Sequence, residues 1–423
     1  MNEAFTHPEW SYNTNIYEVN VRQYSEEGTF NAFERHLPRL KDMGVEILWF
    51  MPVTPISLKD RLGSLGSYYA AQDYQSVNPE FGTLADFRNL VYNAHTLGFK
   101  VIIDWVANHT GNDHIWIDQH PDYFSYDSVT KQLIHPHGWI DVAQLDYTNE
   151  EMQDAMIDAM KFWIVNCDID GFRCDMAHLV PLDFWLLARK EVEKVKGSLF
   201  WLGECEEASY HEVFDATYTW HWMHKTTEFC QHHAGLQDLK NLLQTYNSEF
   251  PKDAFRVYYT SNHDENSWNG TEYEKYGNAV QVLNVFSFTW NGIPMIYSGQ
   301  EMPNKKRIKF FDKDPIQWSE DFKLQGFYQT LLSLRKNNSA LRAGDENATT
   351  KIISTEYNDR IFVFLRNNGN DEIMVFLNFS ADILTLEMTD VPGKFIDVFS
   401  KTPFNSSITV EGWGFKVFEK TSL

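Results

Sequence analysis

Short runs of apolar residues alternate with longer segments of helical periodicity over most of the chain. The apolar runs are predicted to be strands, and they cover residues 15–25, 45–55, 100–109, 169–178, 198–207, 214–222, 256–265 and 292–301. Several runs are almost continuously apolar, which is typical of parallel strands that are covered on both faces. Eight repeats of strand and helix favour a (β/α)8 barrel, with a doubly wound sheet as the alternative fold.

The segments between these runs are predicted to be helices that pack on the outside of the sheet. Residues 83–99, 150–166 and 181–195 show the clearest periodicity. In the first of them one helical stripe carries only apolar residues, namely Leu84, Phe87, Leu90, Val91, Ala94 and Leu97. Gly98 follows that stripe, and a glycine at this place is a common end of a helix.

Two regions interrupt the alternation and predict the domain organisation. Residues 110–145 are aromatic and irregular, and a segment of that length without clear elements is usually functional. After residue 342 the pattern changes to alternating strands at 351–357, 360–368, 372–380, 384–389, 394–400 and 407–420. We therefore predict a catalytic barrel of residues 1–109 and 146–342, an inserted domain of residues 110–145, and a C-terminal antiparallel β-sandwich of residues 343–423.

Composition and charge restrict the class of partner. With 36 basic and 59 acidic residues the chain has a formal net charge of −23, which disfavours nucleic acid and anionic membranes as partners. A neutral ligand would not be repelled, and an aromatic content of 15% offers flat faces for stacking. The four Cys residues have no metal-binding spacing and are expected to be reduced thiols. No apolar run reaches the length of a membrane span, and the N-terminus lacks the pattern of a signal peptide. A monomer in the cytoplasm is expected, or a periplasmic or secreted protein if a leader was removed.

Polar side chains gather where four of the predicted strands end. The third strand ends in Asp104, Asn108 and His109, the fourth in Arg173 and Asp175, the fifth in Glu204, and the seventh in Asn262, His263 and Asp264. In a (β/α)8 barrel these ends form one rim, where active sites lie. We expect Arg173 and Asp175 to point out of the barrel mouth and not into its interior. Any one of these residues alone is commonly structural, so their joint occurrence carries the prediction.

Three carboxyl groups on one rim fit the cleavage of a glycosidic bond. That reaction uses one ionised carboxylate and one carboxyl group that holds a proton. Arg173 beside Asp175 favours the ionised form, as a nucleophile requires. Glu204 lies on an apolar strand next to other acids, and both conditions raise the pKa of a carboxyl group, as a proton donor requires. Asp264 is predicted to bind sugar hydroxyls and developing positive charge, and His109 and His263 to donate hydrogen bonds to hydroxyls.

These motifs resemble the four signature segments of the α-amylase family of glycoside hydrolases, family 13, in the family's order. They are DWVANH (104–109), GFRCDMAH (171–178), GECE (203–206) and SNHDEN (261–266). QLDYTN (144–149) resembles a further family segment, and residues 67–83 resemble the stretch after the second strand, which carries a sugar-stacking Tyr69. The resemblance extends over essentially the whole chain.

The resemblance implies a retaining mechanism on α-glucosidic bonds of starch-like glucans or maltooligosaccharides. Asp175 would be the nucleophile, Glu204 the acid and base, and Asp264 the stabiliser of the transition state. The residues that would bind substrate are Tyr69, Asp104, His109, Arg173, His178, Asn262 and His263. Met176 follows the nucleophile at a position that varies with linkage, and α-1,4 is the expected preference. No organic cofactor is implied.

The resemblance also implies a structural calcium ion between the barrel and the insertion. Asn108 would be one ligand and the carbonyl oxygen of His178 another. Gln144 stands where the family often has an Asp ligand, and Asp141 is the candidate that would compensate. Whether the chain binds calcium stays open at this point.

The sequence leaves several activities open. Within the family the alternatives are an oligo-α-glucosidase, a cyclomaltodextrinase or neopullulanase, a transglycosylase, and a trehalose-forming isomerase. An inactive carbohydrate-binding protein is the alternative from another class, and it is disfavoured because all three acids are present. A nucleotide-binding barrel enzyme is disfavoured because no glycine-rich phosphate loop is evident.

Overall fold

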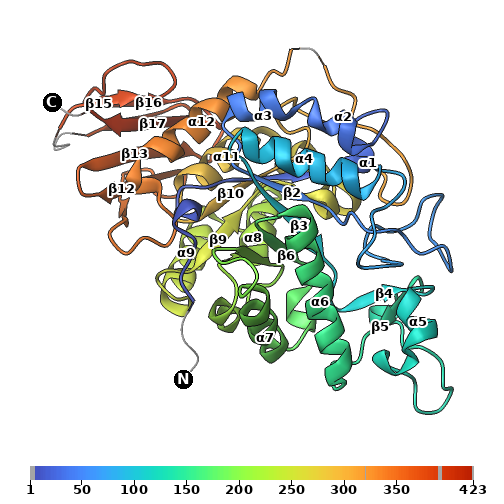
Figure 1. Cartoon of the computed structure of the whole chain (residues 1–423). Helices are drawn as coiled ribbons and strands as arrows, with labels where there is room; N and C mark the ends of the chain where they lie inside the picture. The colour runs from blue at the N-terminus through green and yellow to red at the C-terminus, as the bar shows by residue number, and fades with distance from the viewer. Residues whose placement is uncertain (1–4, 320, 389–392, 422–423) are drawn as a thin grey trace.

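The computed structural model describes residues 5–319, 321–388 and 393–421. Its centre is a closed barrel of parallel strands in the order β1-β10-β9-β8-β7-β6-β3-β2 (Figure 1). The strands are β1 (Ile16–Val19), β2 (Ile47–Phe50), β3 (Lys100–Trp105), β6 (Gly171–Cys174), β7 (Phe200–Gly203), β8 (Ala216–Tyr218), β9 (Phe255–Tyr258) and β10 (Ile293–Tyr297). Seven of them lie inside the predicted runs, and β9 begins at Phe255, one residue before its run. The predicted (β/α)8 barrel is therefore confirmed, and the doubly wound sheet is excluded.

Helices surround the barrel. They are α1 (Val21–Tyr24), α2 (Phe30–Glu34), α3 (Leu37–Met43), α4 (Leu84–Thr96), α6 (Glu150–Cys167), α7 (Leu182–Val192), α8 (Trp220–Cys230), α9 (Leu236–Glu249), α10 (Glu272–Tyr276), α11 (Val280–Thr289) and α12 (Gln325–Asn337). The three helices predicted most clearly are confirmed as α4, α6 and α7. A reciprocal capping box of Thr83 and Asp86 begins α4, and Gly98 follows its end with a φ of +81°.

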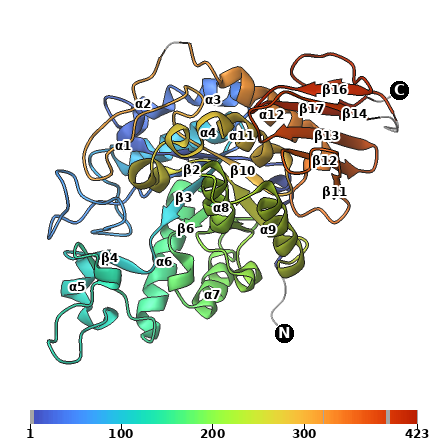
Figure 2. The same cartoon turned by 180° about the vertical axis from the view of Figure 1, so that it is seen from behind.

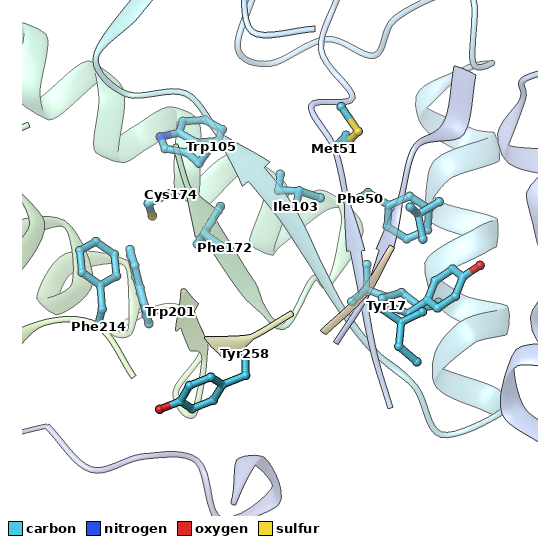
Figure 3. Close-up of a cluster of buried hydrophobic side chains, with 14 of the residues drawn as sticks. Tyr17, Phe50, Met51, Ile103, Trp105, Phe172, Cys174, Trp201, Phe214 and Tyr258 are labelled. Carbon is cyan, nitrogen blue, oxygen red and sulfur yellow. The ribbon is translucent and has the colours of Figure 1, made fainter. Parts of the chain in front are cut away.

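The alternation of side chains along each strand separates two cores. Ile16 and Ile102 belong to the cluster inside the barrel, whereas Tyr17 and Ile103 belong to the larger cluster between barrel and helices. Figure 3 shows the outer cluster, with Trp105, Phe172 and Trp201 among the labelled side chains. Because successive residues of a strand point to opposite faces, a residue's parity predicts the layer it enters.

Gly171 begins β6 at a point where the chain passes very close to β7. A Cβ atom there would lie 1.9 Å from the carbonyl oxygen of Phe200, and the φ of Gly171 is +153°. No side chain fits in that space, so a glycine is required at the start of this strand.

The predicted insertion contains the short helix α5 (Ile115–Gln119) and the hairpin of β4 (His109–Gly111) and β5 (Val142–Gln144), except that β4 begins one residue before it. Both views show this part projecting from the barrel next to α6, on the side away from the C-terminal sheets (Figures 1 and 2). The domain boundaries at 109/110, 145/146 and 342/343 stay predictions.

The C-terminal part is antiparallel, as predicted. One sheet has the order β11-β12-β13-β17-β15 and a second pairs β14 with β16. The strands are β11 (Thr349–Ile353), β12 (Ile361–Asn368), β13 (Asp371–Asn378), β14 (Leu384–Glu387), β15 (Phe395–Asp397), β16 (Ser407–Val410) and β17 (Phe415–Lys420). Thr389, the last residue of one predicted run, lies outside the described residues.

The last predicted run, 407–420, is two strands and not one. Trp413 has a φ of +54°, and a Cβ atom on Gly412 would lie 2.2 Å from the carbonyl oxygen of Ala381. This tight turn moves the chain from the small sheet to the large one.

The four cysteines are free thiols, as expected. Within the described residues no helix has both the length and the apolar character that a membrane crossing needs.

Asp170, just before β6, is a structural carboxylate at the amino end of the barrel. It accepts hydrogen bonds from His95, Lys100 and the backbone of Val101. Burial opposes ionisation, but His95 and Lys196 outweigh it and lower the pKa of Asp170 to about 2. Asp170→Asn is therefore expected to cost about 2 kcal/mol of unfolding free energy at pH 7.

The pH dependence of this loss has a defined sign. Because the folded pKa is depressed, the contribution of Asp170 is full above about pH 4 and disappears as the pH falls towards 2. Chemical unfolding of wild type and variant between pH 3 and 7 measures it. Asp158→Asn is the matched control, since Asp158 has an exposed i,i+3 pair with Lys161 and should change stability by less than about 0.5 kcal/mol. Equal effects of the two variants would contradict the assignment.

Candidate active site

The carboxyl ends of the barrel strands carry charged side chains on their inner face. Ile16 and Ile102 point into the barrel, and the period of two along a strand places Glu18 and Asp104 on the same side, one step higher. Asp104 is in register with Arg173 on β6. Arg173 therefore lies in the upper interior of the barrel and is fully buried. The prediction that it points out of the mouth is wrong for this residue, because its parity directs it inward.

Arg173 joins three carboxyl groups that come from three strands. Its Nη1 donates hydrogen bonds to Asp104 at 2.9 Å and to Asp175 at 2.8 Å. Its Nη2 lies 2.9 Å from Oε2 of Glu204, in an ion pair. Its Nε donates to the hydroxyl of Tyr218 at 3.3 Å. One guanidinium thus fixes the relative positions of Asp175 and Glu204, because its nitrogens lie in a rigid plane.

Asp104 is enclosed by protein donors. Besides Arg173, Nε1 of Trp49 donates to its Oδ2 at 3.2 Å and the hydroxyl of Tyr69 donates at 3.0 Å. The Tyr69 hydroxyl also lies 2.8 Å from Nε2 of His263, and the two rings stack with centroids 5.4 Å apart. Asp104 therefore supports the ring of Tyr69 from below, and 4% of its surface is exposed.

His263 connects two acids on opposite sides of its ring. Its Nδ1 contacts Oε1 of Glu18, and its Nε2 lies 3.2 Å from Oδ2 of Asp264. Burial alone would lower the pKa of His263, but Asp264 and Glu18 raise it well above its ordinary value. In turn His263 lowers the pKa of Asp264 against the effect of burial. The side chain of Asp264 is 42% exposed, so an anionic carboxylate is accessible at the rim.

The acids around Arg173 are harder to ionise. Burial raises the pKa of Asp175 and of Glu204 to about 7, and that of Asp104 to about 6, although Arg173 opposes the shift in each case. For Glu204 this agrees with the prediction. For Asp175 the prediction that Arg173 favours the ionised form is outweighed, because a single cation is shared by three buried carboxyl groups. The group therefore holds protons up to a higher pH than free carboxyl groups do.

The other predicted substrate residues have different surroundings. His109 is buried against Trp139, with ring centroids 5.5 Å apart, and burial lowers its pKa to about 4. The ring of His178 meets that of Trp220 at 5.6 Å. Asn262 uses its Oδ1 to accept a hydrogen bond from the backbone of Glu265, so this side chain stabilises the turn after β9.

Protein donors contact two of the three predicted calcium ligands. The carbonyl oxygen of His178 accepts a hydrogen bond from the hydroxyl of Tyr210 at 3.3 Å. The backbone oxygen and Oδ1 of Asn108 accept hydrogen bonds from the side-chain amide of Gln144. Among the described residues, no group of three or more His, Cys, Asp and Glu side chains is placed to hold a metal ion. Calcium binding stays a prediction, and a calcium ion would have to displace these donors, because it binds six to eight oxygen atoms.

Sequence reasoning missed several residues of the site. Met176 has a left-handed backbone with a φ of 40°, and this turn directs its N–H to Oε2 of Glu204 at 2.8 Å. No sequence pattern predicts that conformation for a methionine. Glu18 could have been found, because it is the one charged residue of the buried strand IYEV. A charged side chain in a buried strand indicates a specific partner. Nothing in the sequence indicated that Trp49 donates a hydrogen bond to Asp104.

Comparison with known proteins finds a matching family model and similar sequences. The family model described as "Alpha amylase, catalytic domain" matches residues 9–137 and 122–333. The α-amylase MalA of Haloarcula japonica is 28% identical over 407 residues, covering 90% of this chain and 57% of the relative. A cyclomaltodextrinase of a Bacillus species is 26% identical over 369 residues, covering 81% and 64%. The chain thus spans about three fifths of the length of these two relatives.

A solved structure gives the same result for the fold. The α-amylase of Lactobacillus plantarum superimposes with a TM-score of 0.88 at 30% identity, covering 97% of this chain and 99% of that one. Barrel, insertion, C-terminal sheets and the carboxyl-rich rim together resemble the glycosidases of the (β/α)8 class. With the family model matching most of its length, the chain belongs to the α-amylase family of glycoside hydrolases.

Proposed function

We propose that the protein hydrolyses α-1,4-glucosidic bonds in starch-like glucans or maltooligosaccharides through a covalent glycosyl-enzyme on Asp175. The observation that carries the proposal is the pair of contacts, 2.8 and 2.9 Å long, from Asp175 and Glu204 to neighbouring nitrogens of Arg173. They hold the two carboxyl groups at a range compatible with the ~5–5.5 Å separation of retaining glycosidases. The names of the relatives support an α-glucan as the substrate.

The contacts also support a division of roles. Nη1 of Arg173 donates a charge-assisted hydrogen bond to Asp175. Glu204 accepts its hydrogen bond from the neutral backbone N–H of Met176, and Nη2 of Arg173 approaches it without forming a hydrogen bond. A hydrogen bond from a charged donor favours the ionised carboxylate more strongly than one from a neutral donor. In this proposal Glu204 therefore carries the shared proton and gives it to the leaving oxygen, while anionic Asp175 attacks the anomeric carbon. Tyr69 stacks on the sugar ring, and Asp264, held by His263, stabilises the positive charge that develops there.

The anomeric configuration of the first product tests this mechanism. We expect the enzyme to release the α-anomer from maltooligosaccharides, because two displacements at one carbon restore its configuration. Proton NMR of the anomeric region within the first turnovers, before mutarotation, measures the ratio of anomers. Release of the β-anomer first would show a single displacement and would overturn the role of Asp175.

Product analysis on maltoheptaose separates hydrolysis from transfer. A hydrolase yields only shorter oligosaccharides, whereas products longer than the substrate indicate a transglycosylase. Parallel digestion of an α-1,6-linked analogue gives the linkage preference. The proposed α-1,4 specificity predicts faster cleavage of the maltooligosaccharide, and the opposite order would refute it.

A further inference from the structure

The side-chain amide of Gln144 sits among oxygen atoms at the junction of barrel and insertion. Its Nε2 lies 3.0 Å from the backbone oxygen of Asn108, 3.1 Å from Oδ1 of the same residue, and 3.3 Å from the backbone oxygen of Leu145. Two of these oxygens are backbone carbonyls, which can only accept a hydrogen bond. The nitrogen end of the amide must therefore face them, so the orientation of Gln144 is determined.

The orientation of the Gln144 amide fixes the orientation of the Asn108 amide. Because Nε2 of Gln144 is a donor, the atom of the Asn108 side chain that it meets must be the acceptor Oδ1. The Nδ2 of Asn108 then faces the other way, 3.2 Å from Nδ1 of His109. Since Nδ2 has only hydrogens to offer, Nδ1 of His109 is an acceptor and its Nε2 carries the proton.

The ring of His109 is the end of this relay. It packs against Trp139 of the insertion, with ring centroids 5.5 Å apart. The relay thus runs from Gln144 on β5, through Asn108 after β3, to His109 at the start of β4.

The oxygens around the Gln144 amide are of the kind that a calcium ion prefers, and Asn108 is the ligand that the family resemblance implies. A protein N–H already points at them, and the carbonyl of His178 is hydrogen-bonded to Tyr210. A neutral amide that presents its nitrogen supplies hydrogen-bond donors where the family resemblance would place a cation.

We infer that Gln144 is a positioning residue that replaces a structural cation and sets the tautomer of His109. The Gln144 side chain, which is part of the protein chain, takes the place of a bound ion and links the insertion to the barrel by hydrogen bonds. It also fixes the direction of the Asn108 amide. The position of the insertion and the proton on Nε2 of His109 then depend on Gln144 and not on calcium. The inference goes beyond the proposed function, and its readouts below do not require activity.

Removal and addition of calcium test the first half of the inference. The melting temperature of the wild type is expected to be the same within about 1 °C in EDTA and in millimolar calcium, because no ion is bound or released there. Gln144→Glu places an acceptor against three acceptors. In EDTA its melting temperature should fall by roughly 2–4 °C, and calcium should restore it, because the carboxylate and the oxygens then form a cation site.

Gln153→Glu is the matched control. Gln153 lies on α6 and donates a single hydrogen bond to the backbone oxygen of Tyr147. The same chemical change there places a carboxylate beside a single carbonyl oxygen, which is too few ligands for a calcium site. The melting temperature of Gln153→Glu should therefore not respond to calcium. A wild type that loses stability in EDTA, or a Gln144→Glu variant that does not respond to calcium more than Gln153→Glu, would overturn the inference.

Histidine-selective ¹⁵N NMR of the wild type tests the second half of the inference, the tautomer of His109. This measurement does not require that the Gln144→Glu variant folds. His109 is assigned from the signal that disappears in His109→Asn. We expect its proton on Nε2 and its Nδ1 unprotonated, with the signal moving towards a mixture of tautomers in Gln144→Glu without calcium. A wild-type His109 with its proton on Nδ1 would show that the relay does not exist, whatever the outcome of activity assays.

Discussion

Replacement of Asp175 by Asn is expected to lower kcat/KM on maltooligosaccharides by at least about 10⁴-fold, the scale on which enzymes lose rate when a covalent nucleophile is removed. The amide has no anionic oxygen to attack the anomeric carbon. Its Oδ1 can still accept the hydrogen bond from Arg173, and a neutral group at this buried position is easier to accommodate. We therefore expect the loss in rate without a loss in thermal stability.

Asp170→Asn is the control for this variant. The two acids flank the same strand, β6, but Asp170 lies at its amino end and Asp175 at its carboxyl end. The first variant should lose stability and keep its rate per folded molecule, whereas the second should do the reverse. Mass spectrometry with a fluorinated glycosyl fluoride adds a direct test, because the wild type should accumulate a label on the peptide that contains Asp175. A wild-type rate for Asp175→Asn would show that the nucleophile is another group.

The sequence predicted the barrel well because its information is local. Each strand is a short apolar run, and helix α4 carries its own capping box and its own terminating Gly98. The rim was also predictable, since parallel strands must end on one side of a barrel. The large sheet of the C-terminal part followed from simple alternation, but the turn at Trp413 did not, because its conformation depends on the approach to Ala381.

The electrostatics of the site could not be predicted from spacing alone. Arg173 and Asp175, two positions apart in the sequence, suggested one cation for one acid. In the structure the same guanidinium serves Asp104 and Glu204 as well, and those contacts join residues far apart in the sequence. Burial then decides the direction of the pKa shift of Asp175, and burial of a single side chain is a property of the whole fold.

The predicted calcium site is a second case in which a local motif does not determine the contacts of its residues. Asn108, which the family resemblance implies as a calcium ligand, is present in the sequence, but what it contacts depends on β5 returning to it from the insertion. Gln144 was visible as a departure from the family pattern. The inference that it supplies donors in place of a cation rests on its position among three oxygens, which the sequence does not give.

Replacement of Glu204 by Gln should reduce kcat/KM on unactivated maltooligosaccharides by about 10³-fold, which is within the usual contribution of a general acid. The glutamine cannot give a proton to the leaving sugar oxygen. On maltosyl fluoride, whose leaving group needs no proton, formation of the glycosyl-enzyme should be reduced far less. Added azide should restore turnover of the covalent intermediate, since it attacks without help from a general base, and should yield an α-glycosyl azide.

The pH profile separates this role from a merely structural one. Because Asp175 and Glu204 both have a pKa of about 7, the active form is the one in which the pair shares a single proton. Wild-type kcat/KM on maltooligosaccharides should therefore peak near neutral pH and fall as the pH rises and the pair loses its last proton. With maltosyl fluoride, Glu204→Gln should lack this alkaline decrease, because no proton remains to be lost. If the variant loses equal rate on both substrates and keeps the alkaline limb, the shared proton is not the one that protonates the leaving oxygen, and Glu204 only holds Arg173 in place.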